Sequence, residues 1–347
     1  MEDAPQKVTS GFLARKLGLS RATVSIVLNG RGPERKITPK TVQRVLDAAR
    51  EYNYVPNQTA RNLRRQRSGV IGVILANFSM DWAERVMTGM LQVLDERRYC
   101  PFVATHRFDP ERHRKELTAA LQRRDEGVIC QPLPAQNGIY REFLRAGVPL
   151  VFLGDRPVDM SEVSYAGWDS GPAARTAVQH LVDIGRKRIG HIGFDYPMRM
   201  TLARFESYRA VLREAGLPCN QQWIAMPPAG QDMRKILGAV LDRMFAPGVE
   251  RPDALFVLND GLALQTIELL DERGIRMPED VAVIGMGDLP FTGHRAIGLS
   301  TMREPCEEMG RAAAQVMVQL IAAPKSAPLI QPIACCELKV RRTTVPQ

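Results

Sequence analysis

The chain has 347 residues, of which 45% are hydrophobic and 24% charged, proportions typical of globular proteins. This length exceeds what one ordinary core can organise, so it excludes a small single-domain protein and predicts two or three domains. The six cysteines include no C-x-x-C pair, the acidic opening residues lack an apolar signal segment, and no stretch approaches the roughly 20 apolar residues of a membrane span. These features predict a cytoplasmic protein with buried, reduced thiols.

The positive charge of the chain is confined to its beginning. Residues 1–67 hold fourteen Lys or Arg and five Asp or Glu, a net charge of +9 that equals the formal net charge of the whole chain. Residues 68–347 therefore sum to zero. A small basic segment followed by a large neutral body predicts electrostatic attraction to a polyanion, which weakens as salt is added.

Two short helices are predicted at the start of the basic segment. Thr9 can cap the first helix, Gly18 can take the positive φ of a tight turn, and Ser20 can cap a second helix over 21–28. Apolar residues then face inward from both helices: Phe12, Leu13, Leu17, Val24, Val27 and Leu28. The outward positions of the second helix are Arg21, Ala22, Ser25, Ile26 and Asn29.

A third helix is predicted from Thr38, with Pro39 at its first position. Three short helices with a glycine turn between the first two form a helix-turn-helix, whose second helix enters the major groove of DNA. Arg21 is the best candidate base reader because its fork can span guanine O6 and N7; the alternative is a solvated arginine. Hydroxyl and amide side chains suited to phosphate contacts are those of Thr9, Ser20, Thr23, Ser25 and Asn29.

A basic segment follows the third helix, from Tyr54 to Arg67. Pro56 and Asn57 can open a helix of about nine residues, which is too short to be stable without a partner or DNA. Leu63 would then be an apolar wedge at a minor-groove base step, flanked by phosphate-binding arginines such as Arg64. The alternative is a plain basic linker.

The order and spacing of residues in this head resemble those of LacI/GalR-family transcription regulators. The matching positions are Ala14, Gly18, Ser20, Thr23, Val24, Ser25 and Asn29, then Asn53, Tyr54, Pro56, Asn57, Ala60 and Leu63. The resemblance implies that 56–64 is a hinge helix contacting DNA through Asn57, Ala60, Leu63 and Arg64, with Leu63 intercalating. Two departures stand out: Phe12-Leu13-Ala14 replaces the usual Asp-Val-Ala, and Ile26 replaces a frequent arginine, so the operator should differ from well-known family sites.

The body alternates apolar runs with amphipathic stretches, which predicts an α/β fold of parallel sheets covered by helices. The expected strands are 70–75, 127–130, 149–153, 188–193, 254–258 and 281–285. The expected helices are 82–98, 110–123, 139–146, 171–185, 201–215, 232–245 and 261–273. Two such sheets would leave a cleft between them at the carboxyl ends of their strands, where small ligands bind.

The body also resembles the family, and the fold class implied is an all-α helix-turn-helix head joined to a periplasmic-binding-protein-like domain of two parallel-sheet subdomains. The motifs that carry this are 169–171 leading into 180–189, 259–263, 278–285, 299–302 and 338–344. The expected domains are therefore a head at 7–55, a hinge at 56–67 and an effector-binding and dimerisation domain at 68–347. The expected subdomains are about 69–167 plus 301–329, and 168–300 plus 330–343.

By family position, the residues expected to hold an effector are Asn77, Phe78, Trp82, Asp155, Arg204, Asn259 and Asp288. Carboxylate, amide and guanidinium groups hydrogen-bond hydroxyls and aromatic rings stack on sugar rings, so the set suits a polyol. In the alternatives, Asp155 only pairs with Arg156, Arg204 is solvated and Trp82 belongs to the core. Gly287 stands where the family often has a carboxylate, with Asp288 one step on, and Gly167-Trp168 replaces an Asp-Asn pair, so the ligand is unusual or absent.

The candidate catalytic and metal-binding motifs are incomplete, so no enzyme activity, metal or cofactor is expected. Gly285-x-Gly287 lacks a third glycine, Asp169 occupies the nucleophile position of a G-x-S-x-G turn, and His106 and His113 lack a metal-ligand spacing. The prediction is a homodimeric regulator, most simply a repressor, that binds a palindromic operator in double-stranded DNA. A small, sugar-like effector would control this binding. No membrane partner is expected. The rivals are a solute-binding receptor with the same body and a nonspecific nucleoid-type DNA binder.

Overall fold

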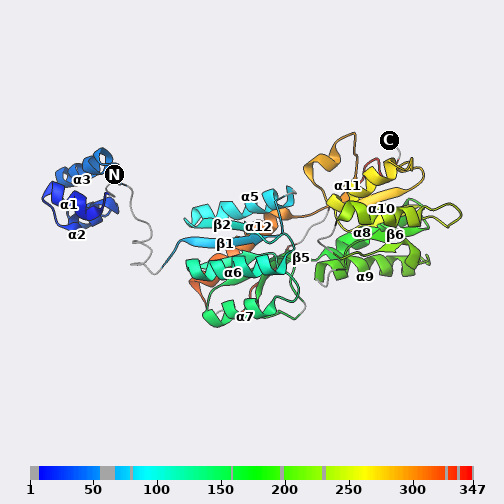
Figure 1. Cartoon of the computed structure of the whole chain (residues 1–347), viewed down its shortest axis with the longest axis horizontal. Coiled ribbons are helices and arrows are strands. Elements are labelled where there is room, and N and C mark those ends of the chain that lie inside the picture. The colour runs from blue at the N-terminus through cyan, green and yellow to red at the C-terminus, as the bar shows by residue number, and fades with distance from the viewer. Residues whose placement is uncertain are drawn as a thin grey trace, which may run out of the picture. The chain divides into compact units, whose positions relative to one another are not determined.

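The computed structural model of the chain describes residues 8–54, 67–78, 81–157, 159–195, 199–228, 232–324, 327–333 and 337–345. The chain divides into two compact units, Met1–Ser68 and Gly69–Gln347, which are treated separately (Figure 1). The expected hinge helix, with Asn57, Ala60, Leu63 and Arg64, lies outside the described residues.

The first unit contains the three helices that the sequence predicts. They are α1 (Ser10–Leu17), α2 (Arg21–Leu28) and α3 (Pro39–Glu51), with a 3-10 turn at Pro33–Arg35. Thr9, Ser20 and Thr38 cap them through their hydroxyl oxygens, and Gly18 takes a left-handed φ of 64°. Their shared core contains Leu13, Ala14, Val24, Val27, Val45 and Ala48.

The first sheet of the second unit is parallel throughout its described strands. These are β1 (Val70–Leu75), β2 (Cys100–Thr105), β3 (Gly127–Cys130), β4 (Leu150–Gly154), β5 (Ser164–Trp168) and β11 (Ile330–Ile333). Their order across the sheet is β11-β5-β4-β3-β1-β2. Four helices cover it: α5 (Asp81–Glu96), α6 (Pro110–Arg123), α7 (Asn137–Ala146) and α12 (Cys306–Ala322).

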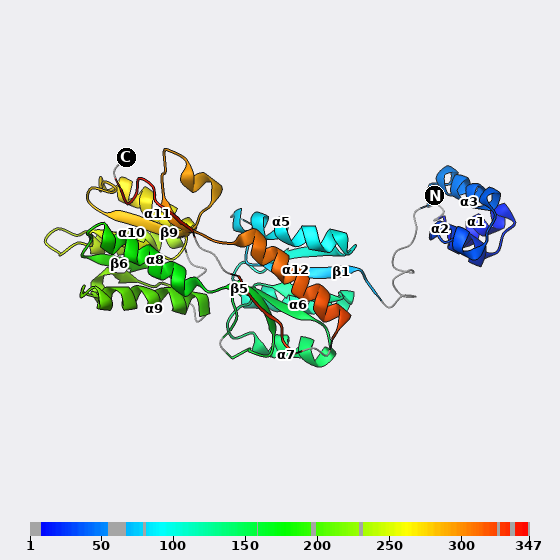
Figure 2. The ribbon, with the colours of Figure 1, turned by 180° about the vertical axis from the view of Figure 1, so that it is seen from behind.

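Side chains of this sheet alternate between two apolar layers, as the period of two in a strand requires. Ile71 and Val73 of β1 pack with residues of α5 and α12 in one cluster. Ile74 packs on the other side with residues of α6 and α7. Figure 2 shows α5 and α12 on one side of β1 and α6 and α7 on the other. Burial on both faces explains the continuous apolar run that predicts β1.

The second sheet has the order β12-β10-β9-β8-β6-β7, and its β10–β12 pair is antiparallel. Its strands are β6 (Ile189–Ile192), β7 (Ile224–Ala225), β8 (Ala254–Val257), β9 (Ala282–Gly287), β10 (Ser300–Arg303) and β12 (Glu337–Lys339). Its helices are α8 (Ser170–Asp183), α9 (Arg199–Glu214), α10 (Met233–Met244) and α11 (Asp260–Asp271). Short 3-10 turns lie at Gln221–Trp223 and Pro290–Gly293.

Strand pairing places the crossovers between the sheets later than the sequence predicts. Thr301 pairs with Gly285 in the second sheet, although 301–329 was expected in the first subdomain. Ile330 pairs with Tyr165 in the first sheet, although 330–343 was expected in the second. The backbone ladder decides this assignment, and both segments are short, so their residue pattern alone does not reveal their partners.

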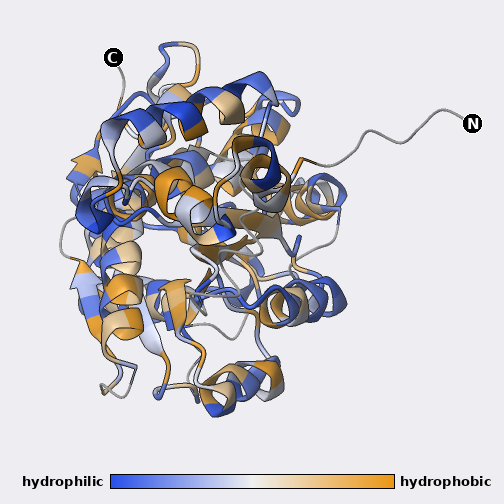
Figure 3. Ribbon diagram, turned by 90° about the vertical axis from the view of Figure 1, so that its left-hand side faces the viewer, coloured by the Kyte–Doolittle hydropathy of each residue, from blue (hydrophilic) through white to orange (hydrophobic). Residues whose placement is uncertain are grey.

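Hydropathy varies along each helix of the ribbon, as in amphipathic helices packed on sheets (Figure 3). Within the described ranges, no helix combines the length and apolar character needed to cross a bilayer. Cys100, Cys130, Cys219 and Cys306 are free thiols, the first and third exposed and the others buried.

Candidate nucleic-acid interface and ligand cleft

Helix α2 presents a mixed outward face on the basic head. Arg21, Ala22 and Asn29 are exposed, while Ser25 and Ile26 are half-buried. These five residues occupy the outward positions that the sequence predicts, because Val24 and Val27 turn into the three-helix core. Their contacts with DNA stay a prediction.

Arg21 lies across the first helix. A Cβ atom added at Gly11 would stand 3.3 Å from the Arg21 Nε atom, so the missing side chain at Gly11 leaves the space that the arginine occupies. Within residues 8–54 and the other described ranges, the Arg21 guanidinium has no hydrogen-bonding or ionic partner. A guanidinium in this state retains all five of its donors for a nucleic acid.

The polar residues near Arg21 already serve the helix ends. The Thr9 hydroxyl accepts a hydrogen bond from the Phe12 amide at 3.1 Å. The Ser20 hydroxyl accepts one from the Thr23 amide at 3.0 Å and lies 2.8 Å from the Thr23 hydroxyl. The Asn29 amide donates to the Ser25 carbonyl at 2.6 Å. Their expected phosphate contacts remain predictions, which a capping hydroxyl permits because it can still donate its own hydrogen.

A cavity of about 210 Å³ lies within the second unit, where the strands of both sheets end. Asn77, Gln131 and Asp155 line it directly after strands β1, β3 and β4. Phe194 and Asn259 line it after β6 and β8. This is the edge at which parallel α/β sheets bind ligands, and the volume suits a small ligand because pockets for drug-sized ligands measure roughly 300–1,000 Å³.

Most of the expected effector residues meet in this cavity. Those that line it are Asn77, Trp82, Asp155, Arg204 and Asn259. Phe78 does not line it, since its side chain is 59% exposed. Asp288 does not line it either, because its carboxylate turns to the Arg341 guanidinium at 2.5 Å.

Arg204 is buried and paired, so the alternative of a solvated helix residue is wrong. Its side chain is 1% exposed and its Nη2 atom lies 2.7 Å from the carboxylate of Glu304, which is 8% exposed. The guanidinium also donates to the Leu258 carbonyl and lies 5.5 Å from the ring centre of Trp168. Its Nε atom has no partner among the described residues.

Asp155 joins the two halves of the cleft through backbone hydrogen bonds. Its carboxylate accepts from the Arg156 amide at 2.7 Å and from the Met200 amide at 3.1 Å. Met200 belongs to α9, on the far side of the cavity from β4. Burial raises the pKa of Asp155 to about 6, an effect that these two amide donors and the nearby arginines only partly oppose.

Five polar residues of the cavity were not singled out as ligand contacts from the sequence: His106, Gln131, Thr201, Asp260 and Glu304. Burial raises the pKa of Asp260 to about 6, against the hydrogen bond that its carboxylate accepts from the Thr301 hydroxyl at 2.6 Å. Burial lowers the pKa of His106 to about 4, so its ring is neutral near pH 7. The signal for Asp260 was its position next to Asn259 at the end of a predicted strand.

Arg85 provides a second link across the cleft. Its guanidinium, on α5, donates to the backbone carbonyl of Glu304 at 3.0 Å and approaches those of Gly287 and Asp288 at 3.4 and 3.3 Å. These carbonyls lie at or directly after the ends of β9 and β10 of the second sheet. The described structure therefore shows the two sheets bridged both inside the cavity and beside it.

Comparison with known proteins decides the family. A model of the bacterial regulatory proteins of the lacI family matches residues 13–57, and a model of the periplasmic binding protein-like domain matches residues 178–344. The HTH-type transcriptional regulator CelR of Thermobifida fusca is 30% identical over 332 residues, covering 93% of this chain and 95% of that protein. The chain belongs to the LacI family of bacterial transcriptional regulators.

Other family members align over similar lengths. The HTH-type transcriptional regulator GntR of Pseudomonas aeruginosa is 27% identical over 314 residues, with 90% of this chain and 89% of that protein covered. A CelR–cellobiose complex superposes with a TM-score of 0.71 at 28% identity, covering 97% of this chain and 99% of that chain. The lac repressor dimer bound to operator superposes with a TM-score of 0.81 at 23% identity, covering 98% and 100%, which supports the shared fold.

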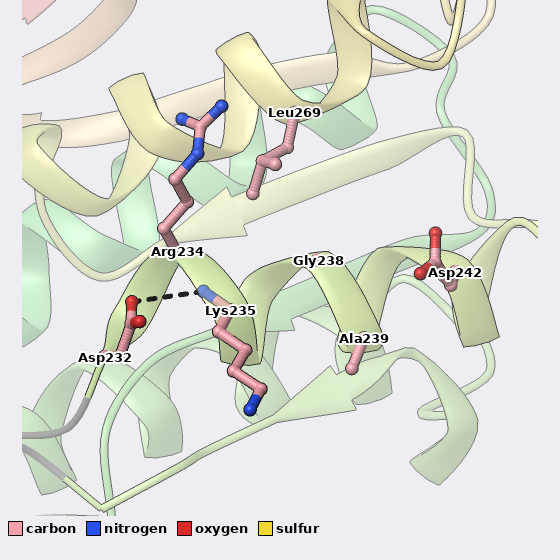
Figure 4. Close-up of a pocket in the computed structure, with 7 residues that line it drawn as sticks. All are labelled: Asp232, Arg234, Lys235, Gly238, Ala239, Asp242 and Leu269. Atoms are coloured by element: carbon pink, nitrogen blue, oxygen red, sulfur yellow. Dashed lines mark hydrogen bonds between the residues drawn. The ribbon is translucent and has the colours of Figure 1, made fainter.

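A second hollow of this regulator is a structural feature of its surface. It lies along α10 and is lined by Asp232, Arg234, Lys235, Gly238, Ala239, Asp242 and Leu269 (Figure 4). Asp232 caps α10 by accepting from the Lys235 amide, and Arg234 pairs with Glu268 of α11 and with Glu272, which caps the end of α11. The Arg234 ion pairs therefore hold α10 against α11 beside this hollow. Within the described ranges, no cluster of three or more histidine, cysteine or carboxylate side chains could hold a metal ion.

Proposed function

We propose that this LacI-family regulator is a homodimeric repressor that binds a palindromic operator and responds to a small, uncharged, sugar-like effector in its cleft. The observation that carries the proposal is the pairing of two features on one chain. A basic head exposes on α2 an arginine that has no polar partner among the described residues, and a neutral body holds between two sheets a cavity lined by both apolar and polar side chains.

The DNA-binding half of the proposal rests on charge and shape. All of the formal net charge of +9 lies in residues 1–67, and Arg21 stands at the first turn of a helix with an exposed outer face. A guanidinium there can bind guanine O6 and N7 in the major groove. A homodimer presents two such helices, so its site is an inverted repeat. The hinge residues Asn57, Ala60, Leu63 and Arg64 would add minor-groove contacts.

The ligand half rests on the chemistry of the cavity. Asp155 and Asn259 offer oxygen and amide groups to hydroxyls, and Trp82 and Trp168 offer faces to a sugar ring. The Arg204 guanidinium is already paired with Glu304, and Asp155 and Asp260 add two further carboxyl groups to the lining. A net acidic lining disfavours an anionic ligand, so sugar acids and phosphates fit poorly. Cellobiose in the CelR complex supports a carbohydrate class for the effector.

Coupling between ligand binding and DNA binding would come from closure of the cleft. Asp155 already links β4 to α9, and Arg85 links α5 to the ends of β9 and β10. A ligand that contacts both sides of the cavity would stabilise one arrangement of the two subdomains over another. Ligand binding then changes the affinity of the protein for its operator, and operator binding changes the affinity for the ligand by the same factor.

The proposed organisation is a DNA-binding head at 7–55, a hinge at 56–67 and an effector and dimerisation domain at 68–347. The site of action is the cytoplasm, where the operator is accessible. We infer that the chain has no catalytic activity and needs no cofactor, because its charged cleft residues pair with one another instead of forming an activated nucleophile.

Two experiments test the proposal. A gel-shift series with the full chain across salt concentrations should show tight binding at low salt that weakens steeply as salt rises; absence of binding at low salt would contradict it and favour a solute receptor. A thermal-shift screen should show stabilisation by a neutral sugar, since a ligand that binds only the native state raises Tm. A matched sugar acid should give a smaller shift, and stabilisation by the acid alone would contradict the uncharged-ligand assignment.

A further inference from the structure

The outward face of α2 contains an apolar strip formed by Ala22 and Ile26. Ala22 is exposed and Ile26 is half-buried, and the two residues are four apart, so their side chains are neighbours on one helix face. Arg21 lies beside the strip and is exposed. On a surface that would meet DNA, the aliphatic residues need an explanation.

Polar neighbours of the strip are engaged elsewhere. The Asn29 amide donates to the Ser25 carbonyl and lies 3.4 Å from the Ser25 hydroxyl. The Ser20 and Thr23 hydroxyls lie 2.8 Å from each other at the helix start. On the outward face of α2, the Arg21 guanidinium has no polar partner among the described residues, and Ala22 and Ile26 are aliphatic.

Aliphatic side chains constrain which bases can face them. A base nitrogen or oxygen that loses water against Ala22 or Ile26 gains no hydrogen bond in return, which is unfavourable. Among the four standard bases, the C5-methyl group of thymine is the apolar group exposed in the major groove. Positions 22 and 26 are about 6 Å apart along the helix axis, which is about two base-pair steps of 3.4 Å.

We propose that Ala22 and Ile26 read thymine methyl groups in each operator half-site, next to a guanine read by Arg21. This inference rests on the proposed function, since it names the chemistry of the DNA that the head prefers. Gly11 contributes by leaving the space in which the Arg21 stem lies against α1, which fixes the spacing between the guanine contact and the methyl contacts. Arg21 is thus a base-contacting residue and Gly11 a positioning residue.

The test begins with selection of duplexes from a random pool by the full chain. The selected half-site should contain guanine with thymine within about two base pairs. Each such thymine is then replaced by deoxyuridine, which removes only the methyl group. Loss of one buried methyl weakens binding about four-fold, so replacement in both half-sites should weaken binding about 16-fold if the half-sites act additively.

Variants assign the effect to the strip. Ile26→Ala should lower the thymine-to-uracil affinity ratio at its position, because the shorter side chain covers less of the methyl group, while the guanine preference persists. Ile26→Asn should redirect selection toward adenine, whose N6 and N7 an asparagine side chain can bind. The matched control Arg35→Ala, in the exposed 3-10 turn outside α2, should leave the thymine-to-uracil affinity ratio unchanged, because an arginine that contacts only phosphates carries no base information.

The outcomes separate the two proposals. Equal binding of thymine and uracil duplexes at every position of a tightly bound operator, or a selected motif without thymine beside guanine, would overturn the role of the strip and leave the regulator intact. Enrichment of no sequence at all would overturn the proposed function itself. An unchanged thymine-to-uracil affinity ratio in a folded Ile26→Ala variant would assign the contact to another residue and overturn the role of Ile26.

Discussion

The Arg204–Glu304 ion pair offers the sharpest test of how the cleft is built. Its two side chains are 1% and 8% exposed and approach to 2.7 Å. Glu304→Gln would leave the Arg204 cation buried without its carboxylate. Removal of one partner of such a pair destabilises a protein by about 3–5 kcal/mol, mostly through the uncompensated charge that remains. Replacing both partners by apolar residues, as in Arg204→Met with Glu304→Leu, should recover most of that loss.

Urea unfolding of the full chain measures this effect. All three tryptophans, Trp82, Trp168 and Trp223, lie in the second unit, so their fluorescence follows that unit. The control pair Arg276–Asp280 is 70% and 40% exposed, so solvent screens it, and its double replacement should leave the free energy of unfolding nearly unchanged. A loss below about 1 kcal/mol in Glu304→Gln, or a double variant as unstable as the sum of the single ones, would refute the buried-pair reasoning.

Three further predictions concern titration, packing and DNA. Burial raises the pKa of Asp155 to about 6 in the folded chain, whereas an unfolded aspartate has a pKa of about 3.9. The folded chain therefore binds this proton more tightly, so the contribution of Asp155 to the free energy of unfolding falls as the pH rises from about 4 to about 6. Asp155→Asn should flatten that decline in urea titrations, and an unchanged slope would contradict it. Gly310→Ala should cost about 1–3 kcal/mol, because the new Cβ would stand 1.9 Å from a backbone carbonyl of α5. The control Gly138→Ala, with open space at its Cβ, should be neutral or slightly stabilising in thermal melts; equal losses in both would refute the close helix contact. Arg21→Ala should relax base preference, whereas Arg64→Ala should weaken all duplexes similarly and flatten the salt dependence; unchanged specificity of Arg21→Ala in a selection experiment would remove its assigned role.

Local signals sufficed to predict much of the fold. Thr9, Ser20 and Thr38 cap the predicted helices because a hydroxyl before an amphipathic run satisfies free amides at a helix start. The continuous apolar run at Val70–Leu75 predicts a strand buried on both faces, and β1 is such a strand. These features depend on residues within one or two turns of each other.

Features set by distant contacts were harder to predict. Strand β2 (Cys100–Thr105) lies at a sheet edge and is partly exposed, so its pattern resembles a loop. His106 directly follows it and was missed as a cavity residue for the same reason. Asp288 was expected in the cleft, but its backbone takes a φ of 55° and its carboxylate pairs with Arg341, 53 residues later. Side-chain direction after a strand is decided by such tertiary partners.

The affinity ratio between a selected operator and a scrambled duplex of equal length tests the central claim most directly. It can be measured by fluorescence anisotropy with the full chain at about 150 mM salt. A sequence-specific regulator should bind the operator at least about 1,000-fold more tightly. Equal Kd values for the two duplexes would contradict the account and identify a nonspecific DNA-binding protein.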